Sequence, residues 1–377
     1  MPDRPLTVMN LLSEEGRGGS DRISLDLSIG LKRRGHRVIF GAPSHCILNQ
    51  EAADAGVEVF EIFPLDSRDS DSLPGFMRFC RENRVDIVNA HHSRSRHLLL
   101  NARLRGLRSK AVFSRHCILR TMPFLGAFFY NFVVAVNIAM SEVIRKSLIR
   151  SGILPSRAVT VHGGINLDRF REAAEEKVRE VRAAYVREGS VAVGMVARMQ
   201  HAGAFNPAKP TLKGHEVLFQ ALNRLPVDFT LLLLGPWERH DIANLTTLAQ
   251  YHGLDASRIS FCGFQQEMAA FYRAMDINVL PSPDEGLGLA VIEGMAAGIP
   301  SVGADAGGLA EVITDGRDGL LFRPGDSRDL ADKMRAIIDS RPLRERLVAG
   351  GRETAGKRFG ADRMAEETER VFYSLLS

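Results

Sequence analysis

Two glutamates and a set of glycines within residues 280–325 are the residues of this 377-residue chain best suited to chemistry. Glu285 and Glu293 have seven residues between them, and Gly286 and Gly288 follow the first glutamate. Glycine permits a tight turn whose N–H groups face a ligand, and the run LAVIEGMA then starts a helix whose N-terminus attracts anions. The pattern predicts a diphosphate site in which Glu293 accepts hydrogen bonds from a ribose diol and Glu285 accepts them from sugar hydroxyls. The alternative is that both glutamates are ordinary exposed acids.

The elements that must hold these residues alternate between strands and helices. Strand-like runs lie at 84–91 and 110–116 in the first half, and DFTLLLLG, RISFCGF and INVLPS are similar runs in the second half. This alternation is typical of parallel sheets with helices on both faces, so we expect an α/β fold. The length is about twice that of a single-core domain, which indicates two domains. The charged, helix-prone run at 171–189 is interpreted as the region that links them.

Two glycine motifs fail the requirements of nucleotide-binding loops. Gly16, Gly18 and Gly19 follow the first strand, but a dinucleotide fingerprint needs a third glycine where Asp21 stands, which argues against NAD. The run 351–357 has the glycines and lysine of a P-loop, but neither Ser nor Thr follows the lysine and no strand precedes the run. We therefore expect neither a dinucleotide cofactor nor a P-loop.

No metal or disulfide framework is expected from the sequence. Asp69 and Asp71 resemble an acidic pair that holds a divalent metal in another fold class, but their run SRDSDS is more simply a solvated loop. The four cysteines are scattered without a C-x-x-C pair, which is typical of a reducing compartment. The N-terminus lacks the basic and apolar regions of a signal peptide, so we expect a cytoplasmic protein.

One stretch carries the whole basic excess of the chain. There is no Asp or Glu between Asp86 and Glu142. The chain has 49 Lys and Arg, so 41 remain outside the stretch against 45 Asp and Glu. Such a stretch attracts anionic lipid headgroups or a phosphorylated acceptor, whereas nucleic acid is not expected because no nucleic-acid-binding motif accompanies the charge. The alternative is a solvated face with partners elsewhere in the fold. The eight cations are Arg94, Arg96, Arg103, Arg105, Arg108, Lys110, Arg115 and Arg120.

Residues 121–141 form an uncharged run of 21 residues, long enough to suggest a membrane-spanning helix. Pro123 and Gly126 interrupt the run, and its end, AVNIAMS, has the pattern of a buried strand. We expect a helix from Phe124 to Val134 followed by a core strand. Arg, Lys and exposed Phe side chains together would also suit peripheral contact with the inner face of the cytoplasmic membrane.

The chain resembles the retaining glycosyltransferases of the GT-B fold, of the family 4 type. The pattern E-G-x-G-L-x-x-x-E carries the resemblance, and the runs AMSEVIRK, VHGGINLDRF, LLLLG and GGLAEVI support it. The resemblance implies two Rossmann-like, doubly wound domains that face a cleft. Residues 1–170 would bind the acceptor, residues 171–358 would bind the nucleotide-sugar donor, and the C-terminal helix at 359–377 would cross back to the first domain.

The resemblance also implies roles for particular residues. Arg198 and Lys213, which a long insertion separates, match the cations that hold the donor diphosphate, and His116 matches a histidine that attends the donor sugar. Together with Glu285, these are the expected catalytic residues. His91 and His92 are candidates for contact with the acceptor or sugar. The remaining donor-binding candidates are Gly18, Gly19, Gly235, Phe264, Ser282, Gly286, Leu287, Gly288, Leu289 and Glu293.

The function implied is retaining transfer of a sugar from a nucleotide sugar, with UDP the commonest carrier in the family. The acceptor would be a saccharide or a lipid-linked saccharide of lipopolysaccharide, capsule or another envelope polysaccharide. Cations and a helix dipole would stabilise the leaving group without metal or other cofactor. Two alternatives remain open: a sugar-nucleotide epimerase or hydrolase on the same fold, and a nucleotide-sugar-binding protein without activity.

Overall fold

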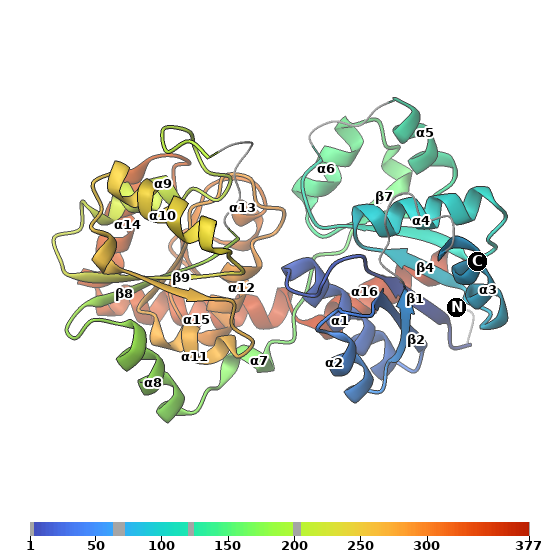
Figure 1. The fold of residues 1–377 in the computed structure, drawn as a ribbon, viewed down its shortest axis with the longest axis horizontal. Coiled ribbons are helices and arrows are strands. Elements are labelled where there is room, and N and C mark those ends of the chain that lie inside the picture. Colours follow the sequence, from blue (N-terminus) through green and yellow to red (C-terminus); the bar gives the residue numbers. More distant parts are fainter. Residues whose placement is uncertain (1–3, 63–71, 120–123, 199–204, 377) are drawn as a thin grey trace. The chain divides into compact units, whose positions relative to one another are not determined.

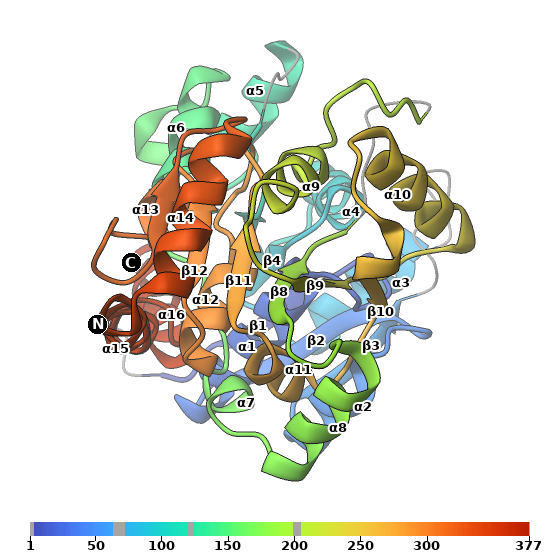
Figure 2. The ribbon, with the colours of Figure 1, turned by 90° about the vertical axis from the view of Figure 1, so that its left-hand side faces the viewer.

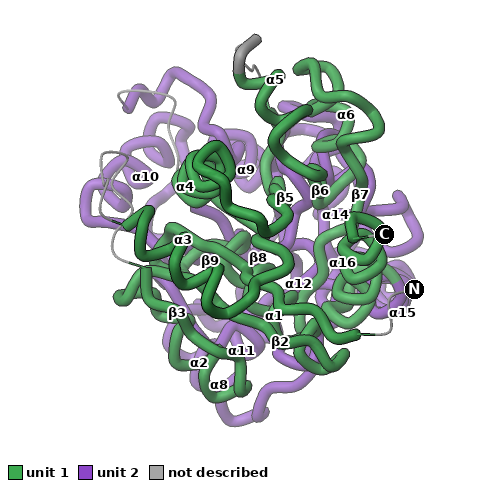
Figure 3. The backbone as a smooth tube through the Cα atoms, turned by 90° about the vertical axis from the view of Figure 1, so that its right-hand side faces the viewer, with its two compact units in different colours: residues 1–166, 358–377 green, residues 167–357 purple. Residues whose placement is uncertain are grey.

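The computed structural model describes residues 4–62, 72–119, 124–198 and 205–376. The chain divides into two compact units, which Figure 3 shows in different colours. Unit 1 comprises residues 1–166 and 358–377, and unit 2 comprises residues 167–357. The first boundary lies four residues before the expected position, and the C-terminal segment returns to unit 1.

Unit 1 is built on a parallel sheet in the order β3-β2-β1-β4-β5-β6-β7. Successive side chains of a strand point to opposite faces, and β1 shows this alternation clearly. Met9 and Leu11 pack into the apolar core beneath the helices α3 (Ser72–Glu82) and α4 (Ser93–Leu104). Asn10 instead donates a hydrogen bond to Ser28 of helix α1 (Gly19–Arg33). Both faces are therefore covered. The strands are β1 (Thr7–Leu11), β2 (Arg37–Pro43), β3 (Glu58–Ile62), β4 (Ile87–Ala90), β5 (Lys110–Arg115), β6 (Val136–Ala139) and β7 (Ala158–Thr160).

The C-terminal helix belongs to unit 1, as the sequence predicts (Figure 1). It packs on α1 so closely that a Cβ atom at Gly30 would lie 2.7 Å from the Cβ of Ala365. His36 and Glu369 join the two segments, with 2.7 Å between Nε2 and Oε1. The helices of unit 1 are α1 (Gly19–Arg33), α2 (Asn49–Asp54), α3 (Ser72–Glu82), α4 (Ser93–Leu104), α5 (Phe124–Phe132), α6 (Glu142–Arg150) and α16 (Ala361–Ser374).

The basic stretch of unit 1 is not one solvated face. Arg96 and Arg115 are buried, at 9% and 5% exposure. Arg94 is exposed near the start of α4, whereas Arg105 and Arg108 are exposed beyond its other end, about 18 Å away at 1.5 Å per residue. The positive charge of the stretch is therefore not gathered in one patch. The buried arginines lie on the inner faces of α4 and β5, and the exposed ones lie at the two ends of α4.

The uncharged run of residues 121–141 forms a helix and a strand where the structure describes it. α5 is followed by β6, whose four residues are all buried, so the expected helix and core strand are confirmed. Among the helices in the described ranges, none has the length and apolarity needed to span a bilayer. Asp69 and Asp71 lie outside the described residues.

Unit 2 has a second parallel sheet, in the order β10-β9-β8-β11-β12-β13. Figures 1 and 2 show α9, α10 and α14 over one face and α7, α8 and α11 over the other. The strands are β8 (Val191–Val196), β9 (Phe229–Leu234), β10 (Ile259–Gly263), β11 (Ile277–Leu280), β12 (Ser301–Ala304) and β13 (Leu320–Phe322). The helices are α7 (Asp168–Arg171), α8 (Glu175–Tyr185), α9 (His215–Leu222), α10 (Arg239–Tyr251), α11 (Met268–Ala274), α12 (Leu289–Ala297), α13 (Leu309–Val312), α14 (Ser327–Asp339) and α15 (Arg341–Arg358).

The interpretation of residues 171–189 as a linker is wrong. Most of this run is α8, which packs against α11 and buries Val178 and Val181. The rings of Tyr185 and Phe271 lie 5.7 Å apart. The charged residues misled the prediction because they form the outer face of an amphipathic helix whose narrow inner face is apolar. The P-loop-like run 351–357 lies inside α15, which agrees with its rejection as a phosphate loop.

Candidate active site

The topology of unit 2 gathers the expected donor-binding residues at one edge of its sheet. The chain continues from β8 to β9 on one side and from β11 to β12 on the other, so β8 and β11 flank the point where the strand order reverses. Ligands of open parallel sheets bind at such a point, outside the carboxyl ends of the strands. Arg198 follows β8, and Ser282 and Glu285 follow β11.

Lys213 and Glu285 form an ion pair at this edge. Lys213 Nζ lies 2.6 Å from Glu285 Oε1, and the side chains are 21% and 15% exposed. The loops that carry them are joined, because Ser282 Oγ donates a 3.2 Å hydrogen bond to the carbonyl of Leu212. Gly214 has φ +72°, and a Cβ atom there would lie 2.6 Å from the carbonyl oxygen of Pro281. The structure therefore joins two residues to which the sequence assigned separate tasks.

Two glycine loops, residues 285–288 and 307–308, lie in close contact just before the start of α12. Gly308 N donates a 2.8 Å hydrogen bond to the carbonyl of Glu285. A Cβ atom at Gly308 would lie 2.4 Å from the carbonyl oxygen of Gly286, and one at Gly288 would lie 2.4 Å from Leu309 Cδ2. Gly288, with φ +89°, is the N-cap of α12, with Leu287 buried before it and Leu289 half-buried as the first helical residue. Positive φ and close backbone contact explain why glycine occupies these positions.

Glu293 lies one turn inside α12 and is held by a residue that the sequence analysis missed. Tyr272 of α11 is fully buried and donates a 2.6 Å hydrogen bond to Glu293 Oε2. Burial first, and then the charge of Glu293, raise the pKa of Tyr272 well above its usual 10.0, so its hydroxyl keeps the proton that it donates. A tyrosine within the apolar run MAAFYRA is the signal that was available, because a buried hydroxyl needs a partner.

Replacing Tyr272 by phenylalanine is expected to raise the KM for the sugar nucleotide by about three- to tenfold, because one hydrogen bond to a charged group is lost and Glu293 is less firmly oriented. The kcat is expected to change little, since the reacting atoms are not touched. Steady-state kinetics at varied donor concentration measure both constants. The control is Tyr251→Phe, at a side chain 59% exposed. Equal KM values for the two variants would contradict the positioning role.

Three further expected donor-binding residues lie at the carboxyl ends of β8, β9 and β10, whereas Gly18 and Gly19 lie in unit 1 at the start of α1. Arg198 is exposed. Gly235 is required for close packing, because a Cβ atom there would lie 2.2 Å from the carbonyl oxygen of Ala197. Phe264 is 38% exposed directly after β10. Trp237, the chain's single tryptophan, was missed; its Nε1 donates a 3.3 Å hydrogen bond to the same Ala197 carbonyl.

In unit 1, the buried His91 and the half-buried His116 form a pair after β4 and β5. His91 Nδ1 and His116 Nε2 are 3.0 Å apart. His91 Nε2 lies 3.2 Å from Asn10 Oδ1 and 3.1 Å from Asn89 Nδ2, so two self-consistent sets of tautomers exist. Both sets leave the buried Nδ1 of His116 as the ring atom without a hydrogen-bond partner among the described residues. In one set that atom is an acceptor and in the other it is a donor.

His92 connects this pair to the N-terminal glycine loop. Its Nε2 lies 3.0 Å from Ser20 Oγ and 2.9 Å from Asp21 Oδ1. Asp21 Oδ2 accepts a 2.9 Å hydrogen bond from Gly18 N, at the start of α1. Asp21, which replaces the glycine of a dinucleotide fingerprint, is thus a helix cap. Gly18 and Gly19 were expected to let this loop approach a diphosphate closely, but the positive φ of +89° in the loop belongs to Gly16.

Because of His91 and His116, the stability of unit 1 is expected to depend on pH. Desolvation, and then neighbouring positive groups, lower the pKa of both His91 and His116 well below the usual 6.5. The unfolded chain therefore binds more protons below about pH 6.5, so stability is complete above that pH and is lost as the pH falls. We expect the two groups together to remove up to about 2.7 kcal/mol of unfolding free energy per pH unit below that point.

Amide hydrogen exchange in β4 and β5 between about pH 7 and about pH 5.5, with rates corrected for intrinsic pH dependence, measures this loss. His116→Gln is expected to reduce the slope by about half. His97→Gln is the control, because His97 is exposed on α4 and contributes no buried imidazole. The prediction is wrong if all three proteins show one slope.

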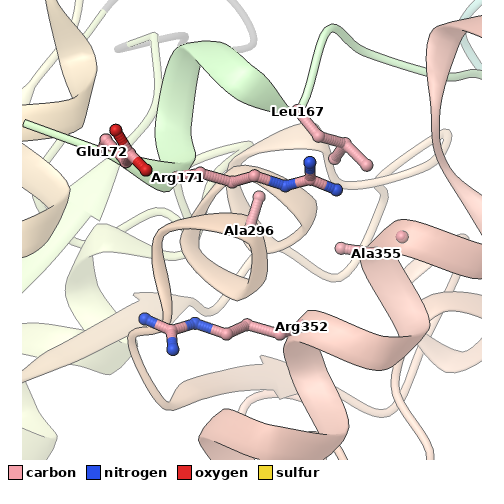
Figure 4. Close-up of a pocket in the computed structure, with 7 residues that line it drawn as sticks. Leu167, Arg171, Glu172, Ala296, Arg352 and Ala355 are labelled. Atoms are coloured by element: carbon pink, nitrogen blue, oxygen red, sulfur yellow. The ribbon is translucent and has the colours of Figure 1, made fainter.

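A cavity of about 320 Å³ in unit 2 contains none of the expected site residues. Arg171 and Arg352 line it, and Figure 4 shows their side chains extending in opposite directions on either side of Ala296. A Cβ atom at Gly298 would lie 2.2 Å from Arg352 Nη2, so that arginine packs against the end of α12. Among the described residues, no group of three His, Cys, Asp or Glu side chains has an arrangement that could hold a metal ion.

Comparisons with known proteins define the class. The structure of HepE from Anabaena in complex with UDP and glucose superposes with a TM-score of 0.82 and 20% identity, over 98% of this chain and 100% of that chain. Two doubly wound sheets with a returning C-terminal helix are the GT-B fold expected from the sequence, and this expectation is confirmed.

Two family models match the chain, one in each half. "Glycosyltransferase Family 4" matches residues 17–169, and "Glycosyl transferases group 1" matches residues 198–340. The chain therefore belongs to the glycosyltransferases of family 4 and group 1.

Curated relatives match over part of their length. An uncharacterized glycosyltransferase of Methanocaldococcus jannaschii is 27% identical over 255 residues, which cover 66% of this chain and 63% of the relative. The lipopolysaccharide core biosynthesis glycosyltransferase LpsE of Rhizobium meliloti is 34% identical over 154 residues, 41% of this chain and 44% of the relative. The matched region thus spans about two fifths to two thirds of these relatives.

Proposed function

We propose that this protein transfers a sugar from a nucleotide sugar, a UDP-sugar in the first instance, to a saccharide or lipid-linked acceptor of an envelope polysaccharide. The observation that carries the proposal is the Lys213–Glu285 pair beside the N-terminus of α12, at the reversal point of the second sheet. The HepE complex with UDP and glucose supports the donor class, and LpsE, named for lipopolysaccharide core biosynthesis, supports the acceptor class.

In this proposal the residues of unit 2 stabilise the departing nucleotide diphosphate. Arg198 and Lys213 supply positive charge, and the first amides of α12 supply fixed hydrogen-bond donors. Glu293 accepts hydrogen bonds from the ribose, while Glu285 accepts them from sugar hydroxyls when the diphosphate draws Lys213 toward itself. Fixed cations and amides need no metal to neutralise the charge that develops on the leaving group.

The acceptor attacks the anomeric carbon from the side of the leaving group, so the configuration is retained. The bond from the anomeric carbon to the diphosphate oxygen breaks as the bond to the acceptor oxygen forms. The acceptor proton passes to the departing phosphate oxygen. His116 keeps the role that the resemblance implies for it, contact with the donor sugar.

Unfolding in the presence of UDP-, GDP- and ADP-sugars tests the donor. A bound ligand at about 100 times its Kd stabilises the protein by about 2.7 kcal/mol, so the preferred nucleotide is identified by the largest shift. NMR of the product gives the anomeric configuration, and assays with EDTA and with Mg²⁺ test metal independence. An epimer or rapid hydrolysis of the donor without acceptor would instead support the epimerase or hydrolase alternative.

We further propose that unit 1 contacts an anionic membrane surface peripherally. Leu104, Phe128 and Phe132 are 54%, 51% and 68% exposed on α4 and α5, and Arg108 and Lys110 are exposed nearby in sequence. Exposed apolar and basic side chains together suit a lipid interface.

Binding to vesicles with anionic lipid is expected to weaken severalfold in Phe128→Ser/Phe132→Ser, and to fall as salt rises, because both burial and charge contribute. Cosedimentation measures it. The control is Tyr251→Ser, an exposed aromatic of unit 2. Binding that does not respond to salt or to the double substitution would refute this contact.

A further inference from the structure

Two arginines of unit 1 are buried without a compensating acid. Arg96 is 9% exposed and Arg115 is 5% exposed. The Nε atom of each is buried and has no hydrogen-bond partner among the described residues. No ion pair joins either guanidinium group to a carboxylate within the described ranges. A buried charge is normally paired or bound to a ligand, because removing it from water is costly.

The neighbouring elements supply no acid. Residues 87–141, which include β4, α4, β5, α5 and β6, contain no Asp or Glu. At the same edge of the sheet, Asp21 is already engaged with Gly18 N and lies 2.9 Å from His92 Nε2. Arg96 is in the first turn of α4, whose helix dipole adds further positive charge. No carboxylate therefore pairs with Arg96 or Arg115 among the described residues, and Arg96 has the carbonyl of His91 as an uncharged acceptor.

The two arginines contact an uncharged acceptor and an aromatic ring. Arg96 Nη1 donates a 3.1 Å hydrogen bond to the carbonyl of His91. The guanidinium carbon of Arg115 lies 6.0 Å from the centre of the Tyr130 ring, and Tyr130 also contacts Arg96. Burial, and then repulsion by Arg115, lower the pKa of Arg96 to about 10. His116, with its unpartnered Nδ1, directly follows Arg115, and the next residue, Cys117, is exposed. The cluster thus adjoins solvent after β5.

We infer that Arg96 and Arg115, with Tyr130 and His116, form a binding site for an oxyanion, and that its natural occupant is a phosphate group carried by the acceptor. Two guanidinium groups present parallel N–H donors that match phosphate oxygens. The assignment of the anion to the acceptor rests on the proposed function. It adds to that function a substrate class: acceptors that carry a phosphate ester.

Titration of the full chain with inorganic phosphate at constant ionic strength tests the site, with ³¹P NMR as the measurement. Saturable binding is expected, and Arg115→Met and Arg96→Met are each expected to weaken it at least about tenfold, because charged hydrogen bonds are lost. Without phosphate, neither variant is expected to unfold earlier than the parent, since an unpaired buried charge has been removed. A purely structural role predicts the opposite: earlier unfolding and no saturable binding in the parent.

The control variant is Arg105→Met, at an exposed arginine beyond the far end of α4. It is expected to change phosphate affinity by less than about twofold, because the two sites are separated by the length of the helix. If Arg105→Met and Arg115→Met weaken binding equally, diffuse attraction to a basic surface explains the binding and the site is refuted.

A second measurement needs no arginine variant. Cys117 is exposed, whereas Cys46, Cys80 and Cys262 are buried, so iodoacetate should modify Cys117 selectively. Iodoacetate is an anion that the guanidinium groups attract, so bound phosphate is expected to slow its reaction severalfold. The neutral reagent iodoacetamide should be slowed much less. Equal effects of phosphate on both reagents, or none, would overturn the inference.

The source of the anion is distinguished with glycerol 3-phosphate, a phosphate ester. It is expected to compete with inorganic phosphate for the Arg96–Arg115 site; a site that accepts phosphate but rejects the ester refutes the acceptor assignment. UDP binding separates the two proposals. Phosphate binding that depends on Arg115 while UDP fails to bind would count against the proposed function alone, and the reverse result would count against this site alone.

Discussion

Replacing Lys213 by methionine is expected to lower kcat/KM for the sugar nucleotide by roughly 10- to 150-fold, the loss of one charge-assisted interaction of about 1.5–3 kcal/mol. The proposed diphosphate loses a cation, and Glu285, only 15% exposed, is left as an unpaired carboxylate beside it. Both consequences oppose formation of the leaving group. Arg198→Ala is expected to lose at least about tenfold for the first reason alone.

A double variant separates the two contributions. In Lys213→Met/Glu285→Gln the repulsive carboxylate is neutral, so UDP affinity is expected to recover in part while turnover stays low, because Glu285 is also proposed to hold the sugar. Calorimetry with UDP and steady-state kinetics measure the two quantities. The control is Lys209→Met, an exposed lysine of the same loop. Parent-like kinetics in Lys213→Met would remove this lysine from the site.

Gly308→Ala is expected to destabilise unit 2 by about 1–3 kcal/mol and to lower activity about 100-fold. The new methyl group would lie 2.4 Å from the carbonyl oxygen of Gly286, and main-chain atoms cannot move aside as a flexible side chain can. The turn between Glu285 and α12 must shift, and a misplacement of about 1 Å at a reacting site has an effect of that size. Urea unfolding and kinetics at saturating donor measure both losses.

The matched control is Gly356→Ala, in the same unit. A Cβ atom at Gly356 meets nothing within 4 Å, and the residue lies inside α15. Alanine is expected to stabilise a helix at such a position by up to about 1 kcal/mol. If Gly308→Ala keeps the stability and activity of the parent, the close contact of the two glycine loops does not position the site.

Local patterns predicted most of the fold. The apolar runs at 84–91 and 110–116 became β4 and β5 because buried parallel strands are apolar on both faces. Residues 171–189 were misread because the outer face of an amphipathic helix and a solvated linker share one composition. Only packing distinguishes them, as the burial of Val178 and Val181 shows.

The sequence proposed individual site residues but not the contacts between them. It named Glu285, Glu293 and Lys213 as candidates, and it did not point to Tyr272, Trp237 or the link between Asp21 and His92. The spacing of E-G-x-G-L-x-x-x-E lies within one turn and one helix, where local geometry fixes relative positions. Contacts such as Tyr272 to Glu293 and Lys213 to Glu285 join elements 21 and 72 residues apart, and no local pattern encodes them.

The sequence alone determined the class of fold, the glycine turn and the excess of positive charge in residues 87–141, since these follow from composition and short-range periodicity. The tertiary structure decided where that charge lies. Two arginines were placed inside unit 1, and others were left in water at opposite ends of α4. The reason is physical: burial depends on which face of a helix or strand meets the sheet, and only the assembled layers fix that face.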